Sequence, residues 1–265
     1  MLASSLPEDF DKQPYQFRRI LVTHLRVNIQ HSVMEKKKVD RYLDDAHEKF
    51  GVLLMEQGYN CEAEKFQIQV LDARSRLLGE EHPATIWAMG NLAATYESLG
   101  KYADAEKLKT QALDMRTRLF GEEHLDTIGA INNLANTYQN LEKYADAEKL
   151  QIQVLNMRSR FFGEEHPDTI NAMENLAITF YYVQKYKDAA RLEVQVVDIR
   201  KKIFGEEHPQ TVKAVALLAE IRSQANTNTS GTESKKKGKS YILWNLIDSC
   251  IHNINISSPP FQNCK

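Results

Sequence analysis

The sequence lacks the marks of a secreted, disulfide-stabilised or membrane-spanning protein. Its three cysteines, Cys61, Cys250 and Cys264, are scattered with no CxxC pair, which argues against a disulfide scaffold or a zinc ribbon. No apolar run approaches the roughly 20 residues that a membrane span needs. The first residues, MLASSLPEDFDKQP, carry acids and proline where a signal peptide needs an apolar run. These absences predict a cytoplasmic protein in a reducing compartment.

An excess of charge of one sign is also lacking, since 34 basic and 36 acidic residues leave a net charge of −2. Such a balance offers no field that would attract nucleic acid or an anionic membrane surface. Catalytic signatures are missing too. There is no GxSxG, GxGxxG or HExxH, and the GKS at 238–240 lacks the glycine that opens a phosphate-binding loop. We therefore predict a protein that is not an enzyme and that has no cofactor, metal, nucleic-acid partner or membrane partner.

What the sequence contains instead is an internal repeat. GEEHP at 79–83 returns as GEEHL at 121–125 and as GEEHP at 163–167 and 205–209, always 42 residues further on. Within each copy, two stretches carry apolar residues three or four positions apart, the spacing of an amphipathic helix. In one copy these residues are Ile86, Met89, Leu92, Ala93, Tyr96 and Leu99, then Ala105, Leu108, Ala112, Leu113, Met115 and Leu119. A helix pair with one apolar side buries it only by stacking on further copies, so the repeat predicts an all-α solenoid.

Small residues recur at fixed positions inside both helices, where they would let a neighbouring helix approach closely. They are Gly51, Ala93, Ala135 and Ala177 in the first helices and Ala63, Ala105, Ala147 and Ala189 in the second. Between the two helices of one copy, Gly100 is free to adopt a positive φ in a short turn.

Two interpretations of the GEEH motif compete, a metal site and a boundary between helices. Consecutive copies in a helical stack lie at least about 10 Å apart, so the four histidines cannot converge on one ion. As a boundary, every letter has a role. Gly79 ends a helix in the left-handed conformation, His82 falls at the N-cap and Pro83 at the first position of the next helix. We therefore predict that the motif separates one repeat from the next.

The segments LAATY and LANTY of the first helices, the Gly-Lys-Tyr of the turn and the ADAEKL of the second helix resemble the tetratricopeptide repeat. The 42-residue length and the R-x-x-G-x-x-H-P-x-T spacer are similar to the longer variety found in kinesin light chains and in arrays attached to STAND-type signalling NTPases. HEAT and armadillo repeats have a compatible period but not these motifs. The resemblance implies a right-handed α-solenoid of about 4.5 antiparallel helix-pair repeats.

The same frame predicts the organisation of the whole chain. We expect a disordered N-terminus at 1–13, an N-terminal capping helix at 14–38, a repeat domain at 39–222, a disordered linker at 223–240 and a tail at 241–265. The repeats fall at about 41–82, 83–124, 125–166 and 167–208, closed by a helix at 209–222. The apolar tail fits no repeat register. Three interpretations of it stay open: docking on the array, a short binding segment, or an artefact of the gene model.

The resemblance places peptide binding in a concave groove lined by the first helices. Asn91, Asn133 and Asn175 stand at the repeat position whose asparagine, in related arrays, bonds the backbone of a bound peptide. An amide suits that role because it donates and accepts hydrogen bonds at once. The alternative is that these amides bond a neighbouring helix or water. The other predicted groove residues are Asn132, Asn136, Asn171, Glu174, Trp87, Tyr181 and Tyr182.

The predicted groove face is neutral to acidic, with Lys49 and Lys213 as its basic residues. It lacks the clusters of basic residues by which chaperone-tail-binding tetratricopeptide domains, and kinesin light chains, hold acidic ligands. We therefore predict a non-catalytic scaffold or adaptor that binds an extended neutral or basic segment of a protein partner. Two finer roles stay open: a sensor module of a STAND-type NTPase signalling system, and a kinesin-light-chain-like cargo adaptor linked to a motor complex.

Overall fold

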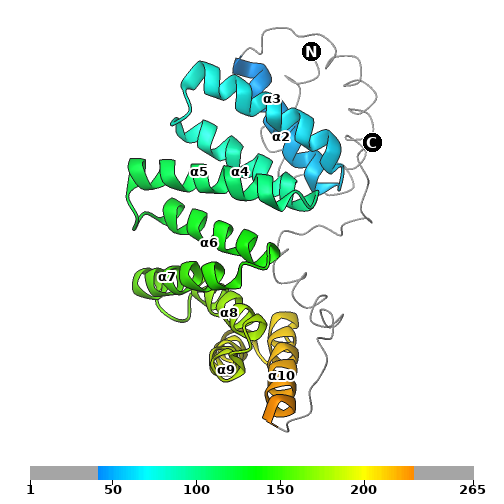
Figure 1. Cartoon of the computed structure of the whole chain (residues 1–265), viewed down its shortest axis with the longest axis vertical. Coiled ribbons are helices and arrows are strands. Elements are labelled where there is room, and N and C mark those ends of the chain that lie inside the picture. The colour runs from blue at the N-terminus through cyan, green and yellow to red at the C-terminus, as the bar shows by residue number, and fades with distance from the viewer. Residues whose placement is uncertain (1–40, 230–265) are drawn as a thin grey trace. The chain divides into compact units, whose positions relative to one another are not determined.

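The computed structural model describes residues 41–229, and every regular element in that range is an α-helix (Figure 1). In chain order the helices are α2 (Arg41–Glu56), α3 (Asn60–Leu78), α4 (Pro83–Ser98), α5 (Tyr102–Phe120), α6 (Leu125–Asn140), α7 (Tyr144–Phe162), α8 (Pro167–Tyr182), α9 (Tyr186–Phe204) and α10 (Pro209–Thr229). The predicted all-α fold is confirmed for these residues. The segments predicted at 1–13, 14–38 and 241–265 lie outside the described range.

The described chain divides into two compact units, with the boundary inside α5 after Met115. In unit 1, residues 41–115, α3 packs against both α2 and α4, and α2 also touches α4. Ile86 and Met89 of α4 meet Ala112 and Met115 of α5 in a buried cluster. The apolar stripes expected of the two helices of a repeat therefore face each other.

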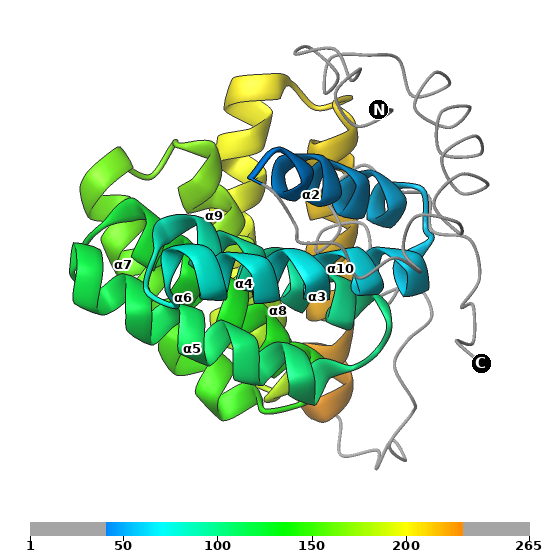
Figure 2. The same cartoon turned by 90° about the horizontal axis from the view of Figure 1, so that it is seen from above.

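In unit 2, residues 116–229, each helix from α6 to α9 packs against the next, and α6 also touches α8. The last helix, α10, drawn yellow to orange, lies beside α9 in both views (Figures 1 and 2). Ile170 and Met173 of α8 pack with Val196 and Val197 of α9 in its core. In both units, the residues at the same two repeat positions of the first helix therefore pack on the second helix of the same repeat.

The GEEH motif forms the boundary that the sequence predicts. The Nδ1 atom of His82 accepts a hydrogen bond from the backbone N–H of Ala84 at 3.2 Å, and Pro83 is the first residue of α4. His124, His166 and His208 cap α6, α8 and α10 in the same way. Three of these rings also stack on the phenylalanine four residues earlier, as His166 does on Phe162 with ring centroids 4.4 Å apart. The histidine therefore both caps the new helix and packs on the end of the old one.

Replacing His166 with alanine is expected to lower the free energy of unfolding by about 1 kcal/mol, because an N-terminal amide of α8 loses its acceptor. Urea denaturation followed by circular dichroism measures the change. His166→Asn is the matched control, since asparagine is a strong N-cap and should recover the hydrogen-bond part of the loss. Equal losses in the two variants would assign the effect to the ring stacking on Phe162 instead.

The glycines behave partly as predicted. Gly79 ends α3 with a positive φ of 91°, but its ψ is 162°, so it lies in the extended region that only glycine enters and not in the left-handed helical region that we expected. Gly163 and Gly205 do the same, which directs the chain away from the helix toward the next cap. Gly100 has the predicted positive φ, 72°. At the equivalent turns Glu142 and Gln184 adopt positive φ without being glycine.

The small residues at the predicted crossing points are all buried, and the seven alanines among them have no exposed surface. One residue of the predicted stripes differs. Leu119 is exposed, as are Leu77, Phe161 and Ile203 at the same repeat position. The second helices have 19 residues and the first helices of the four repeats have 16, so the last turn of each second helix has less partner surface to pack on.

One boundary prediction needs correction. The closing helix does not end at 222 but continues to Thr229, so the first residues of the predicted linker at 223–240 are helical. Cys61, near the start of α3, is disulfide-bonded, although the scattered cysteines argued against a disulfide scaffold. Within 41–229, no helix has the length and apolar character to cross a bilayer.

Candidate functional site

One arginine of each second helix ties that helix to the next repeat. Arg74, Arg116, Arg158 and Arg200 stand 42 residues apart, and each donates to a backbone carbonyl in the first turn of the following helix. The acceptors are Ala84, Asp126, Asp168 and Gln210, at 3.0 to 3.3 Å. These arginines were not among the site residues predicted from the sequence, although their period of 42 could have revealed them.

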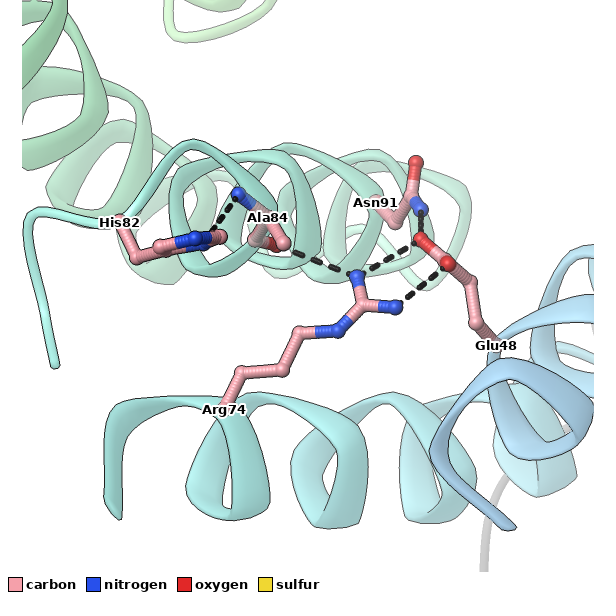
Figure 3. A network of polar contacts seen from close by, with 5 residues as sticks. All are labelled: Glu48, Arg74, His82, Ala84 and Asn91. Atoms are coloured by element: carbon pink, nitrogen blue, oxygen red, sulfur yellow. Dashed lines mark hydrogen bonds and ion pairs between the residues drawn. The ribbon is translucent and has the colours of Figure 1, made fainter. Parts of the chain in front are cut away.

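In the first repeat this arginine also meets an acid. Arg74 donates to both carboxylate oxygens of Glu48, at 3.1 and 2.7 Å, and the side-chain amide of Asn91 donates to Glu48 at 3.2 Å. Figure 3 shows the guanidinium of Arg74 between the Glu48 carboxylate and the backbone carbonyl of Ala84. The Asn91 amide lies above Oε1 of Glu48, the oxygen that also accepts from Nη1 of Arg74. Asn91 therefore bonds a neighbouring helix, the alternative raised for the asparagines at the sequence level.

The fourth repeat contains the same pair, more deeply buried. Arg200 donates to Glu174 at 2.7 and 2.9 Å, and the two side chains are only 5% and 6% exposed. Glu174 is thus enclosed in an internal ion pair, although the sequence predicted it on the groove surface. Buried polar groups are retained when a partner satisfies them, and Arg200 is that partner.

The second and third repeats have no glutamate at the position of Glu48 and Glu174. Gly90 and Asn132 occupy the positions that Glu48 and Glu174 hold, and neither Arg116 nor Arg158 forms an ion pair within residues 41–229. Burial lowers the pKa of both guanidiniums, and the nearby Asp126 and Asp168 act in the opposite direction. These two arginines are held by carbonyl contacts at 3.3 and 3.0 Å, and no carboxylate among the described residues forms an ion pair with them.

The asparagines of α6 and α8 belong to one unit and lie on neighbouring first helices. Gln139 of α6 donates to the backbone carbonyl of Asn175 at 3.2 Å, which joins the two helices. Asn133 is exposed, Asn175 is half-buried, and the side chain of Asn175 has no hydrogen-bond partner among the described residues. The Oδ1 atoms of Asn132 and Asn136 are buried without a hydrogen-bond partner in the same range. Asn171 is half-buried on α8.

The predicted aromatic anchors differ in accessibility. Trp87 of α4 is 59% exposed, the largest apolar side chain to be so open among the described residues. Tyr182 stacks on Tyr144 at 4.8 Å between ring centroids, and burial raises its pKa to about 12. Tyr181 packs edge-on against Tyr182 and Tyr186, and its hydroxyl donates to Glu220. Both tyrosines are half-buried and pack in one aromatic cluster near the α8–α9 turn.

The acids expected to make the groove negative are largely neutralised within the fold. Besides Glu48 and Glu174, Glu97 of α4 pairs with Lys109 of α5 at 2.7 Å. Burial lowers the pKa of Lys109, and the Glu97 carboxylate partly restores it. An acid that already pairs with an internal cation contributes little field to a ligand outside.

Helix pairs repeated every 42 residues, capped by the same histidine and tied by the same arginine, define an α-helical repeat protein. The family model for the tetratricopeptide repeat matches residues 43–118 and 126–202, which is more than half of the chain. The chain belongs to the tetratricopeptide repeat family. Proteins of this fold are in general scaffolds for protein–protein interaction, with a surface built from stacked repeats.

Solved structures with a similar fold have kinesin-light-chain-like repeats. A protein of Podosopora anserina, described as a kinesin light chain with nearly identical TPR-like repeats, is 22% identical at a TM-score of 0.63, covering 78% of this chain and 94% of that one. A point variant of the same protein is 21% identical with the same TM-score, covering 78% and 92%. BtubC (BKLC) of P. vanneervenii is 18% identical at 0.60, covering 85% and 91%. No curated protein matches the chain closely enough to indicate homology.

Proposed function

We propose that this protein is a non-catalytic scaffold that holds an extended segment of a partner protein against the first helices of its repeats. The observation that carries the proposal is the pair of asparagine amides on neighbouring first helices of unit 2. Asn133 of α6 is exposed, and the side chain of the half-buried Asn175 of α8 has no hydrogen-bond partner among the described residues. Amides pair with peptide groups whatever the side chains of the peptide. Binding would therefore rest mainly on the ligand backbone.

The partner segment is proposed to be neutral. The sequence alone favoured a neutral or basic segment, but Glu48, Glu97 and Glu174 are each paired with an internal cation. Within unit 1, Trp87 of α4 is by itself a candidate anchor, because exposed aromatic side chains often anchor a bound peptide. A sensor module of an NTPase system and a cargo adaptor of a motor complex are finer forms of this same role, and both would use the same surface.

A peptide-display selection against the intact chain tests the proposal. The double variant Asn133→Ala/Asn175→Ala should weaken binding of the selected peptides about fivefold to thirtyfold, as the loss of one or two hydrogen bonds of about 1 kcal/mol each implies. Asn156→Ala, an exposed asparagine on the second helix α7, is the matched control and should leave affinity unchanged.

The chemistry of the ligand gives a second readout of the same surface. N-methylation of single backbone amides of a selected peptide should reduce binding, while alanine at the same peptide position should reduce it less. Undiminished binding to the double variant, or a peptide whose affinity depends only on its side chains, would refute the asparagine surface. Circular dichroism of each variant confirms that helicity is retained.

A further inference from the structure

The second helices of unit 2 end in large apolar side chains that stay open to solvent. Each helix finishes with two such residues directly before the glycine of the GEEH motif, and all of them are 38–46% exposed. They are Leu119 and Phe120 of α5, Phe161 and Phe162 of α7, and Ile203 and Phe204 of α9. Single exposed apolar side chains are ordinary, but a set that returns in pairs at one repeat position marks an interaction surface. We call these six residues the apolar pairs.

Contacts within the chain explain only one member of each pair. The phenylalanine next to the glycine stacks on the histidine cap of the following helix, in all three repeats. The residue before it is the more exposed of the two in each pair. Those residues are Leu119, Phe161 and Ile203. The cap therefore needs one large ring, and the second apolar side chain has no part in it.

The two glutamates of the motif likewise have no part in the helix boundary. The side chains of Glu122, Glu164 and Glu207 are exposed and make no hydrogen bond or ion pair within residues 41–229. Beside the apolar pairs, the exposed charged residues are six glutamates and only four cations. The glutamates are Glu122, Glu123, Glu164, Glu165, Glu206 and Glu207, and the cations are Arg118, Arg160, Lys201 and Lys202. The helix ends are therefore both apolar and net negative.

Ion pairs place the three helix ends next to one another. Arg160 at the end of α7 pairs with Glu123 in the loop before α6. Lys202 at the end of α9 pairs with Glu165 in the loop before α8. Each pair joins residues of consecutive repeats, 37 positions apart in the chain. The apolar pairs and the six glutamates thus form one edge of unit 2, which we call the loop edge.

We propose that the loop edge is a second interaction surface, and that it binds a segment of a partner protein in which large apolar side chains alternate with lysine or arginine. The apolar pairs offer area to bury, and the unpaired glutamates attract cations. Arg160 shows the same chemistry within the chain, since its guanidinium lies 5.4 Å from the ring centroid of Phe161 and pairs with Glu123. A basic side chain of the partner would find the same combination of ring and carboxylate.

The charge of the loop edge disfavours the other possible occupants. A second copy of the chain, edge against edge, would bring glutamates to face glutamates, and like charges across an interface reduce affinity. The cytoplasmic face of a membrane is itself negative and repels the same side chains. The surface is also separate from the asparagine surface, which lies on the first helices, so the two can be tested independently.

A labelled amphipathic peptide of leucine and lysine, followed by fluorescence anisotropy on the full-length chain, tests the surface. The variant Leu119→Ser/Phe161→Ser/Ile203→Ser should weaken its binding at least about tenfold, because three exposed apolar side chains are lost. These substitutions spare the phenylalanines that stack on the caps. Peptides with glutamate in place of lysine, or serine in place of leucine, should bind at least about tenfold more weakly to the unaltered chain.

A matched control removes equally exposed apolar side chains elsewhere in unit 2. Ile152→Ser/Val212→Ser/Val215→Ser changes residues that are 39–52% exposed on α7 and α10 and should leave peptide binding unchanged. Circular dichroism and urea denaturation confirm that each variant keeps the helices of 41–229.

The charged part of the surface has its own variant and control. Glu122→Gln/Glu164→Gln should weaken the leucine–lysine peptide about threefold or more at low salt and flatten the salt dependence of its affinity. Asp146→Asn/Asp188→Asn removes two exposed acids from the opposite ends of α7 and α9 and should change neither.

Three outcomes would overturn the proposal. Peptide binding that survives the serine variant at the helix ends, or falls equally in the two serine variants, would remove the loop edge as the site. A preference for the leucine–glutamate peptide would contradict the basic partner. Self-association of the chain that only the variant at 119, 161 and 203 abolishes would make the occupant a second copy. Asn133→Ala/Asn175→Ala should leave this binding unchanged, which separates a failure here from a failure of the proposed function.

Discussion

Arg200→Leu is expected to lower the free energy of unfolding by about 3–5 kcal/mol, well beyond the loss expected from removing the His166 cap. The guanidinium makes two hydrogen bonds to Glu174, and both side chains are buried. Without the cation the Glu174 carboxylate would stay buried and unpaired, with Glu193 as a second acid close enough to influence it. Urea denaturation at pH 7, followed by circular dichroism, measures the loss.

The repeat offers a matched control at the same structural position. Arg158 also bonds a first-turn carbonyl, at 3.0 Å, but has no carboxylate partner among the described residues, so Arg158→Leu should cost only about 1 kcal/mol. Equal losses for Arg158→Leu and Arg200→Leu would show that the carbonyl contact, and not the ion pair, carries the stability. The double variant Glu174→Leu/Arg200→Leu should recover most of the loss, because it leaves no buried charge behind.

The second large effect is a gain in stability from replacing the buried Glu193. Glu193→Gln is expected to raise the free energy of unfolding by about 1–3 kcal/mol above neutral pH, because the Glu193 side chain is fully buried and both its oxygens lack a hydrogen-bond partner within 41–229. The equivalent residues Gln67 and Gln151 show that glutamine fits this position. In the third repeat, Gln151 accepts a hydrogen bond from the hydroxyl of Thr179 at 2.6 Å.

The gain depends on pH in a direction that the contacts determine. Burial raises the pKa of Glu193 well above its usual value of 4.5, Glu174 raises it further, and Arg200 opposes the change. A group that binds its proton more tightly in the folded state stabilises that state fully only below its unfolded pKa. The stability of the unaltered chain should therefore fall as pH rises above about 4.5, until the folded pKa is passed, and Glu193→Gln should remove that fall.

Denaturation series at several pH values measure this slope. Glu164→Gln, an exposed glutamate in the loop before α8, is the control and should leave both the stability and its pH dependence unchanged. A stability difference between Glu193→Gln and the unaltered chain that does not grow with pH would contradict a buried, protonated Glu193.

Much of the local structure could be predicted because it depends on near neighbours in the chain. The GEEHP boundary places a helix start at Pro83 and an N-cap at His82 through contacts two residues apart. The crossing-point alanines could be identified from their period of 42 alone. The end of α10 could not be predicted, because residues 223–229 are polar and carry no apolar spacing that would indicate a helix.

The predicted groove residues show that contacts between helices could not be predicted from the sequence. Glu174 has the position of a groove residue in its own helix, yet a residue 26 positions away, Arg200, encloses it in an ion pair. Tyr181 and Tyr182 likewise look like free anchors until Tyr144 and Tyr186 are placed beside them. A helical pattern tells which side of a helix a residue occupies, but not what the neighbouring helix presents to it.

The order of residues along the chain was enough to establish the repeat, the family, the alternation of first and second helices and the caps that begin them, because each depends on residues within one or two turns. The packing of the helices was needed to learn which arginines have an acid, which amides are left unpaired and which apolar side chains at the helix ends stay exposed. Those outcomes depend on side chains brought together from different helices, and a spacing along the chain does not specify such pairs.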